Sequence, residues 1–363
     1  MISFRNVTKT YGNVNAVDNI SFDIKSHELF VLIGPSGSGK TTTMEMINRL
    51  TDMTSGEIYI DDLNIKDIDK VKLRRSIGYV IQDVGLMPHM TISENISLVN
   101  RLKGKKKDEV RIDELLDLVD MDVSFKDRYP DELSGGQQQR IGVIRALYSD
   151  PNIILMDEAF SALDPVTRSE LQDEFIYLQE TIKKTIVFVT HDMDEALKIA
   201  DRIAVMKDGK IEQIGTPEEL IFNPNSTFVQ KFIGEERQRK YIMEHFKVKD
   251  FTNKEYPIAL DDSKTKIISL MKDQRINKIP VKNEEQYYAY DFFRLLEDDF
   301  EVEDVVVLNE NTDFNTTMNI ISANKNKLHI VVDEANDYNG VLDIQKLFSM
   351  LSTDSKRGEA YVE

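Results

Sequence analysis

The segment from Gly34 to Thr41 has residue types and a spacing that suit phosphate binding: GPSGSGKT matches G-x-x-x-x-G-K-[ST]. Glycines let consecutive backbone N–H groups point at phosphate oxygens, and a following helix presents the positive end of its dipole to the same anion. We expect Lys40 to reach the β- and γ-phosphates of a nucleotide, and the Thr41 hydroxyl to ligate Mg²⁺. The alternative is a glycine-rich turn with a chance lysine. The apolar run 30–33 before the loop and the helical pattern after it favour the nucleotide site.

Two adjacent carboxylates, Asp157 and Glu158, follow a second apolar run. One acid at a strand end can hold Mg²⁺, directly or through water, and the next is placed to accept a proton from an attacking water. Paired acids by themselves more often form a solvated strand end, but a phosphate loop in the same chain favours the catalytic interpretation. Gln82 and His191 also follow apolar runs, so we expect them at the same edge of the sheet.

A second glycine-rich helix start lies at residues 133–140, which read LSGGQQQR. Glycine costs about 1 kcal/mol relative to alanine inside a helix. At a helix N-terminus, however, glycine lets backbone N–H groups approach a phosphate closely. The sequence therefore predicts two anion-binding helix starts in one chain.

The elements that must position these residues follow from hydrophobic periodicity. Alternating residues predict strands at 2–7 and 20–24, with a turn at 10–12 that carries Tyr11. Tyr11 is either half-buried packing or an aromatic ring for a purine base to stack on. Continuous apolar runs predict buried strands, and helical spacing predicts helices after the loop, near 70–75, within 91–124 and after Ser134. The predicted buried strands are 30–33, 77–81, 153–156 and 186–190.

Composition excludes several classes of protein. The chain has 363 residues, 41% of them hydrophobic and 30% charged, which fits two or three soluble domains. The absence of cysteine excludes disulfides and thiol chemistry. The net charge of −18 argues against nucleic acid as the main partner. No apolar stretch is long enough to cross a bilayer and the N-terminus lacks a signal-peptide pattern, so we expect a cytosolic chain.

Together these residues resemble the nucleotide-binding subunit of an ABC transporter over roughly residues 1–235. The resemblance implies an α/β fold: a P-loop ATPase domain with a RecA-like mixed sheet core, an antiparallel β subdomain and a helical subdomain. It also implies ATP with Mg²⁺, which Thr41, Gln82 and Asp157 would bind. Glu158, His191, Gln82 and Lys40 would be catalytic. The implied nucleotide-binding residues are Tyr11, Gly34, Pro35, Ser36, Gly37, Ser38, Gly39, Lys40, Thr41 and Thr42.

The family's head-to-tail dimer gives the second helix start a role. The residues implied to contact the ATP held by the other copy are Ser134, Gly135, Gly136, Gln137 and Asp164. One departure from the family is Ala159, where proline usually follows the catalytic glutamate; we expect little loss of hydrolysis and a less rigid turn.

Residues 41–50, 78–82 and 85–91 are most similar to importers of quaternary-amine osmoprotectants such as glycine betaine, carnitine and choline. Such an ATPase would lie at the cytoplasmic face of the membrane, with integral membrane permease subunits and, through the complex, an extracytoplasmic substrate-binding protein. Two alternatives are an importer of an amino acid or polyamine and a soluble ABC ATPase that does not transport.

The tail beyond residue 235 predicts a helical linker at 236–247 and an internal repeat, 248–298 and 299–363. Each copy should contain a helix, a strand, a short strand and a last helix, in the manner of a degenerate tandem CBS α+β module. CBS pairs commonly bind adenine nucleotides through an acid near the last helix, where this chain has Arg294 and Lys346. Three interpretations stay open: binding of cyclic di-AMP or another adenine nucleotide, a response to ionic strength, and structural dimerisation.

Overall fold

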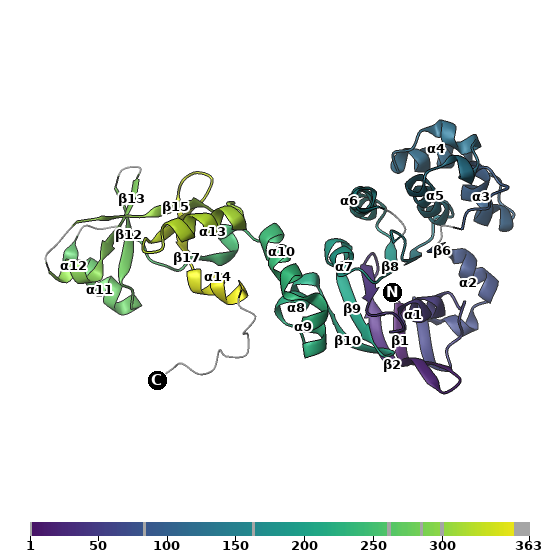
Figure 1. Ribbon diagram of the computed structural model, residues 1–363, viewed down its shortest axis with the longest axis horizontal. Coiled ribbons are helices and arrows are strands. Elements are labelled where there is room, and N and C mark those ends of the chain that lie inside the picture. The colour runs from purple at the N-terminus through teal and green to yellow at the C-terminus, as the bar shows by residue number, and fades with distance from the viewer. Residues whose placement is uncertain are drawn as a thin grey trace. The chain divides into compact units, whose positions relative to one another are not determined.

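A computed structural model of the chain describes residues 2–82, 85–161, 164–259, 263–283, 286–297 and 301–351. The chain divides into two compact units, Met1–Ile233 and Gly234–Glu363 (Figure 1). Among the described helices, none combines the length and the apolar character that a bilayer span requires.

A six-stranded sheet forms the centre of the first unit, in the order β10-β9-β3-β8-β7-β6. Its strands are β3 (Leu29–Ile33), β6 (Ile77–Val80), β7 (Ile153–Asp157), β8 (Thr185–Thr190), β9 (Arg202–Lys207) and β10 (Lys210–Gly215). Only β10 is antiparallel to its neighbour. Every residue of β3, β7 and β8 is buried, as expected of parallel strands covered on both faces. The four predicted buried strands are confirmed.

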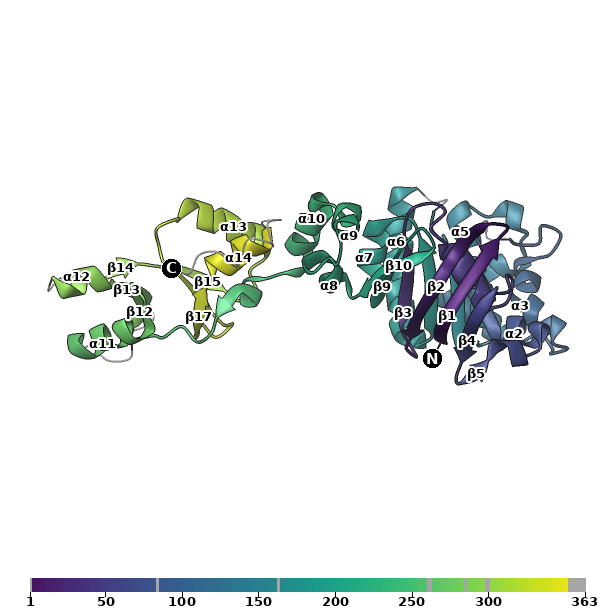
Figure 2. The ribbon, with the colours of Figure 1, turned by 90° about the horizontal axis from the view of Figure 1, so that it is seen from below.

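An antiparallel sheet in the order β2-β1-β4-β5 accompanies the central sheet (Figure 2). Its strands are β1 (Ile2–Tyr11), β2 (Val14–Ile24), β4 (Ser55–Ile60) and β5 (Leu63–Asn64). The ring of Phe22 stacks between those of Phe4 and Phe30, at centroid distances of 4.4 and 5.4 Å, which joins the two sheets in one core. The turn predicted at 10–12 is present but lies at residues 12 and 13, because β1 continues to Tyr11, which pairs with Val14.

Helices complete the first unit. A group of three, α3 (Ile92–Leu102), α4 (Glu109–Leu118) and α5 (Gly135–Tyr148), packs together through contacts of α5 with α3 and α4 (Figure 1). The other α-helices are α1 (Lys40–Ile47), α2 (Lys70–Ser76), α6 (Pro165–Ile182), α7 (Met193–Ile199), α8 (Pro217–Phe222) and α9 (Thr227–Ile233). Short 3₁₀ turns are η1 (Ile65–Asp67), η2 (Val123–Asp127) and η3 (Pro130–Glu132).

The second unit begins with α10 (Glu235–His245), which corrects the predicted linker at 236–247. The helix is present, but it contacts α13 (Phe314–Ala323) and belongs to the second compact unit. Ile242 is fully buried and Tyr241 nearly so. A helix with buried apolar residues of this kind is part of a domain rather than a free connector.

Each half of the predicted repeat has the expected order of helix, two strands and helix. The first half has η4 (Val248–Phe251), β11 (Thr252–Asn253), α11 (Lys264–Gln274), β12 (Lys278–Asn283), β13 (Gln286–Asp291) and α12 (Phe292–Leu296). The second half has β14 (Glu303–Asp304), β15 (Val306–Asn309), α13, β16 (His329–Val332), β17 (Tyr338–Leu342) and α14 (Ile344–Leu351). The parts of the predicted repeat at 260–262, 284, 285, 298–300 and 352–363 lie outside the described residues.

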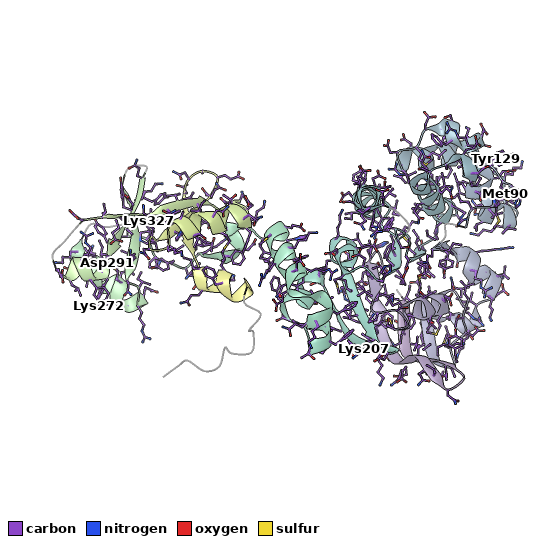
Figure 3. All side chains as sticks on the ribbon, in the orientation of Figure 1. Met90, Tyr129, Lys207, Lys272, Asp291 and Lys327 are labelled. Carbon is purple, nitrogen blue, oxygen red and sulfur yellow. The ribbon has the colours of Figure 1, made fainter. Side chains whose placement is uncertain are left out.

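The two halves exchange their first short strands. β11 pairs with β17 in the sheet β11-β17-β16-β15, and β14 pairs with β13 in the sheet β12-β13-β14. The strand β13 ends at Asp291, labelled in Figure 3, whose carboxylate accepts hydrogen bonds from the amides of Phe293 and Arg294 and so caps α12. Neither half completes its sheet alone, so the repeat is one structural unit.

Candidate functional site

Four parallel strands of the central sheet end at the same edge, and a candidate site residue follows each of them. Strand β3 leads into the loop at Gly34, β6 into Gln82, β7 into Glu158 and β8 into His191. The carboxyl ends of parallel strands are where open α/β sheets bind their ligands. This confirms the expectation that these residues share one edge of the sheet.

The phosphate loop is shaped by glycines that touch neighbouring backbone. Gly39 is left-handed (φ 99°), and a Cβ there would lie 2.3 Å from the carbonyl oxygen of Ala16. A Cβ on Gly34 would lie 2.1 Å from the carbonyl oxygen of Met206. No side chain caps α1, whose N-cap residue is Gly39. The first N–H groups of α1 therefore remain available for an anion.

Two side chains of the loop have polar atoms that fit a phosphate. Lys40 is 7% exposed, and its ammonium donates to the carbonyl oxygens of Gly34 (2.8 Å) and Pro35 (3.0 Å). Burial lowers the pKa of Lys40, while the nearby Glu158 opposes that shift. The hydroxyl of Ser38 is buried and has no hydrogen-bond partner in the described part of the chain. A buried cation and an unsatisfied hydroxyl are the groups that phosphate oxygens would satisfy.

Oxygen ligands suited to Mg²⁺ meet beside the loop. The Thr41 hydroxyl lies 3.3 Å from Oδ1 of Asp157, which is 8% exposed. Burial raises the pKa of Asp157 to about 6, and the neighbouring carboxylates add to that shift. A hydroxyl and a carboxylate in this position fit a hard cation, which prefers oxygen ligands. The positive charge of the ion would also stabilise Asp157 in its ionised form.

Glu158 is held by contacts from two other strand ends. Its backbone is left-handed (φ 44°), an uncommon conformation for a residue with a side chain, and its amide donates to Val189 O at 2.9 Å. Gln82 Nε2 lies 3.4 Å from one carboxylate oxygen of Glu158, and His191 Nδ1 lies 3.1 Å from the other. The structure therefore brings Gln82, Glu158 and His191 together, although they are far apart in the sequence.

Tyr11 lies at the end of β1 and is 52% exposed. The hairpin that β1 forms with β2 is linked to the loop, because Ala16 on β2 lies against Gly39. The Tyr11 ring contacts Lys9, whose ammonium lies 4.7 Å from the ring centroid. The aromatic face is thus presented at the surface beside the phosphate loop.

The second glycine-rich helix start forms a separate surface. Ser134 and Gln137 cap α5 reciprocally: the Ser134 hydroxyl accepts from the Gln137 amide, and the Gln137 side chain accepts from the Ser134 amide. A Cβ on Gly136 would lie 3.0 Å from the Thr167 methyl group on α6. A cavity of about 230 Å³ opens here. Its lining residues are Asp120, Met121, Asp122, Phe125, Ser134, Gly136, Gln137, Arg140 and Thr167.

Asp164, predicted to contact nucleotide, caps the helix that faces this surface. Its carboxylate accepts hydrogen bonds from the amides of Val166 (3.2 Å) and Thr167 (3.1 Å) at the start of α6. The hydrogen bond to Thr167 lowers the pKa of Asp164. In the described part of the chain, the side chains of Ser134, Gln137 and Asp164 form their hydrogen bonds within the first turns of α5 and α6 and not with Lys40. One copy of the chain therefore presents two surfaces, one at Lys40 and one at Ser134.

Sequence reasoning missed Arg168, which lies one turn into α6. Its Nε donates to the carbonyl oxygen of Phe160 at 3.1 Å, and its Nη2 to that of Ser161 at 3.2 Å. Its Nη1 lies 3.6 Å from Oδ2 of Asp192, the residue after His191. Arg168 thus connects the segment after Glu158 to the segment after His191. Arg168 belongs to no motif in the sequence, so the sequence carried no distinct signal for it.

Comparison with known proteins agrees with this geometry. The family model described as ABC transporter matches residues 17–161. Choline transport ATP-binding protein OpuBA of Bacillus subtilis is 52% identical over 293 residues, 79% of this chain and 76% of that protein. Glycine betaine/carnitine/choline transport ATP-binding protein OpuCA of the same organism is 53% identical over 288 residues, 77% of this chain and 75% of that protein. A solved dimeric ATP-binding cassette, in a post-hydrolysis state bound to ADP and Pi, is 38% identical with a TM-score of 0.54, covering 60% of this chain and 99% of that chain.

Proposed function

Because this chain belongs to the ABC transporter family of ATP-binding subunits, we propose that it hydrolyses ATP to energise uptake of a quaternary-amine osmoprotectant. The observation that carries the proposal is the meeting of Lys40, Thr41, Asp157, Glu158 and His191 at one edge of the sheet. The cargo class follows from the relatives named for choline, carnitine and glycine betaine. The cargo is glycine betaine, carnitine or choline.

Each side chain at this edge has a role in the proposed reaction. Lys40 and the first amides of α1 bind the β- and γ-phosphates. Thr41, Gln82 and Asp157 hold Mg²⁺, which supplies neutralisation of charge on the phosphate oxygens. Glu158 accepts a proton from the attacking water, and His191 orients that carboxylate and contacts the γ-phosphate. The 3.1 Å contact between His191 Nδ1 and a carboxylate oxygen of Glu158 supports the orienting role of the histidine.

The proposed site is completed by a second copy of the chain. Ser134, Gly135, Gly136 and Gln137 of one copy, with Asp164, cover the nucleotide bound at Lys40 of the other. Two observations support this: the exposure of Ser134 and Gly135, and the cavity of about 230 Å³ at the start of α5. The related cassette bound to ADP and Pi is described as dimeric. ATP between two copies closes the dimer, and hydrolysis releases it.

The proposed partners are integral membrane permease subunits and, through them, an extracytoplasmic substrate-binding protein. The ATPase lies at the cytoplasmic face of the membrane, and closure of its dimer moves the permease through the surface at 82–90. Residues 83 and 84 of that surface lie outside the described residues. Met87 is exposed at 39%, so its side chain is accessible to such a partner.

The second unit is proposed to regulate the ATPase as a tandem CBS module. The strand exchange between β11 and β17 and between β13 and β14 supports one module made from two repeats. Nη2 of Arg294 lies 2.7 Å from Oε2 of Glu301, and the Lys346 ammonium donates to the Asp250 carbonyl oxygen at 2.8 Å. Neither position offers an acid to a ribose. Cyclic di-AMP or another adenine nucleotide, a response to ionic strength and structural dimerisation therefore remain the three candidates.

Three experiments test the proposal. Uptake of labelled glycine betaine, with carnitine, choline, amino acids and polyamines as competitors, should identify the cargo in membranes that carry the whole complex. Competition by an amino acid or polyamine alone would favour the alternative importer. Purification of the chain without any integral membrane protein would favour a soluble ABC ATPase. For the second unit, melting of the full chain with and without each adenine nucleotide reports binding, because a ligand of the folded state raises the melting temperature.

A further inference from the structure

Lys9 occupies a position that the predicted site does not explain. It lies two residues before Tyr11 on β1, so both side chains are on the same face of the strand. Its ammonium lies 4.7 Å from the centroid of the Tyr11 ring. A lysine ammonium within about 6 Å of an aromatic face is attracted by the ring's negative quadrupole.

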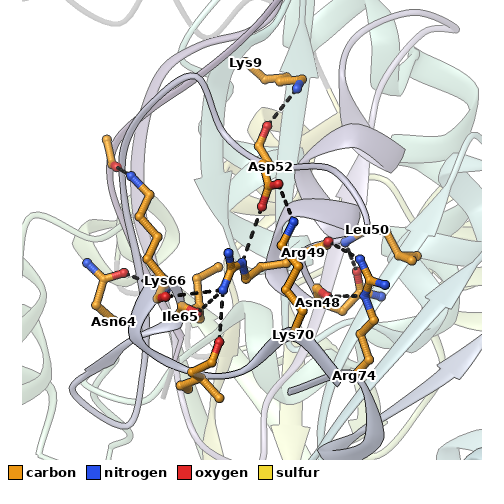
Figure 4. A network of polar contacts seen from close by, with 12 residues as sticks. Lys9, Asn48, Arg49, Leu50, Asp52, Asn64, Ile65, Lys66, Lys70 and Arg74 are labelled. Carbon is orange, nitrogen blue, oxygen red and sulfur yellow. Dashed lines mark hydrogen bonds and ion pairs between the residues drawn. The ribbon is translucent and has the colours of Figure 1, made fainter. Parts of the chain in front are cut away.

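The ammonium of Lys9 is fixed from the other side by the segment that follows the phosphate-loop helix. It donates to the carbonyl oxygen of Asp52 at 2.7 Å (Figure 4). This carbonyl lies five residues after the end of α1 at Ile47, so the segment that follows α1 supports the lysine that lies on the ring. The Lys9 side chain therefore connects the Tyr11 ring to the segment after α1.

The support itself is held by a polar network. The Asp52 carboxylate contacts the ammonium of Lys70 at 2.6 Å and Nε of Arg49 at 3.4 Å. Arg49 Nη1 also donates to the carbonyl oxygens of Ile65 (3.1 Å) and Ile68 (3.0 Å) (Figure 4). Asp52 is thus anchored through its side chain, which leaves its backbone carbonyl for Lys9.

We propose that Lys9 is a positioning residue for nucleotide binding: it covers one face of the Tyr11 ring and holds it so that the opposite face receives the purine base of ATP. The inference rests on the proposed function, since it requires a nucleotide at the loop. Lys9 acts through Tyr11 and not on the phosphates. Its contribution should therefore appear only when the ligand has a base and only when position 11 has an aromatic ring.

A double-mutant cycle in the full chain tests this. The binding of ADP and of tripolyphosphate, which lacks a base, is measured by calorimetry for wild type, Lys9→Met, Tyr11→Leu and the double variant. Lys9→Met should weaken ADP binding about two- to five-fold, the range for an exposed cation–π contact, and leave tripolyphosphate binding unchanged. In the Tyr11→Leu background, Lys9→Met should cause no further loss. Lys9→Arg should retain affinity, because a guanidinium also binds an aromatic face.

Lys72→Met is the matched control, since it removes an exposed lysine of α2, whereas the side chains that hold Asp52 are those of Lys70 and Arg49. The proposal is overturned if Lys9→Met has no effect on ADP, if it weakens tripolyphosphate equally, if its effect persists without Tyr11, or if Lys72→Met reproduces it. Failure of the proposed function looks different: wild type would then bind neither ADP nor tripolyphosphate.

Discussion

Nδ1 of His191 lies 3.1 Å from a carboxylate oxygen of Glu158, although the two residues are 33 positions apart. The contact exists because β7 and β8 are adjacent and parallel, so the residues that follow them meet. The His191 side chain is 60% exposed and that of Glu158 is 22% exposed. The histidine is therefore placed to respond to a ligand at the surface while it orients a more buried carboxylate.

Glu158→Gln should bind ATP and fail to turn it over. The amide cannot accept the proton of the attacking water, and loss of a general base lowers kcat by about 100-fold or more. ATP binding and phosphate release measured on the same preparation check both parts. Glu57→Gln removes an exposed carboxylate on β4 and should leave both unchanged. Phosphate release by Glu158→Gln at a near wild-type rate would refute the base assignment.

Arg168→Met should lower kcat about tenfold with little change in ATP affinity. The guanidinium donates to the Phe160 and Ser161 carbonyls and faces Asp192, and these three contacts are with the segments after β7 and β8. Arg168→Lys should not restore the rate, because one ammonium cannot make three divergent contacts. Steady-state kinetics over a range of ATP concentrations separate kcat from KM.

Lys198→Met is the control for Arg168, because Lys198 also joins α7 to α6 through Asp173, at 2.7 Å. Its other contacts in the described part of the chain are with Ser169, which also lies on α6. An equal loss of kcat in both variants would mean that Arg168 only holds two helices together.

A chain truncated after Ile233 should keep basal ATPase activity and lose regulation. The boundary follows the division between the compact units. In addition, 99% of a solved cassette aligns with only 60% of this chain, so a cassette can exist without the remaining part. A truncation after His245 should be less soluble, because it retains α10, which carries the buried Ile242, and lacks α13, which α10 contacts. ATPase assays and light scattering of both truncations check this. Loss of ATPase activity in a folded 1–233 chain would contradict the division of labour.

His329 should make stability fall as pH decreases below about 7. It is 1% exposed in β16, and burial lowers its pKa more than the Lys327 backbone raises it. Below the ordinary histidine pKa of about 6.5, the unfolded chain binds a proton that the folded chain resists, so unfolding becomes more favourable. Above that pH, His329 is neutral in both the folded and the unfolded chain and does not change the stability with pH.

The difference in melting temperature between pH 7.5 and 5.5 measures this effect. His329→Leu should reduce the difference, while His89→Asn, which removes an exposed histidine, should leave it at the wild-type value. The same pH dependence in His329→Leu and wild type would exclude His329 as its source.

Local patterns determined much of the fold and site. The apolar runs that became β3, β6, β7 and β8 could be predicted because burial on both faces leaves a continuous hydrophobic signature. The phosphate loop could be predicted because its glycines, lysine and threonine act within eight consecutive residues. The helix and strand order of each repeat in the second unit was also predictable from local periodicity.

Only the tertiary structure decided which distant groups meet. The order of the strands places His191 beside Glu158, and the packing of α6 places Arg168 between two loops. The loop after α1 places the Asp52 carbonyl at Lys9. These contacts depend on strand order and helix packing, which hydrophobic periodicity does not encode because it reports only whether a residue is buried. The sequence thus determined the chemical groups, and the fold determined their partners.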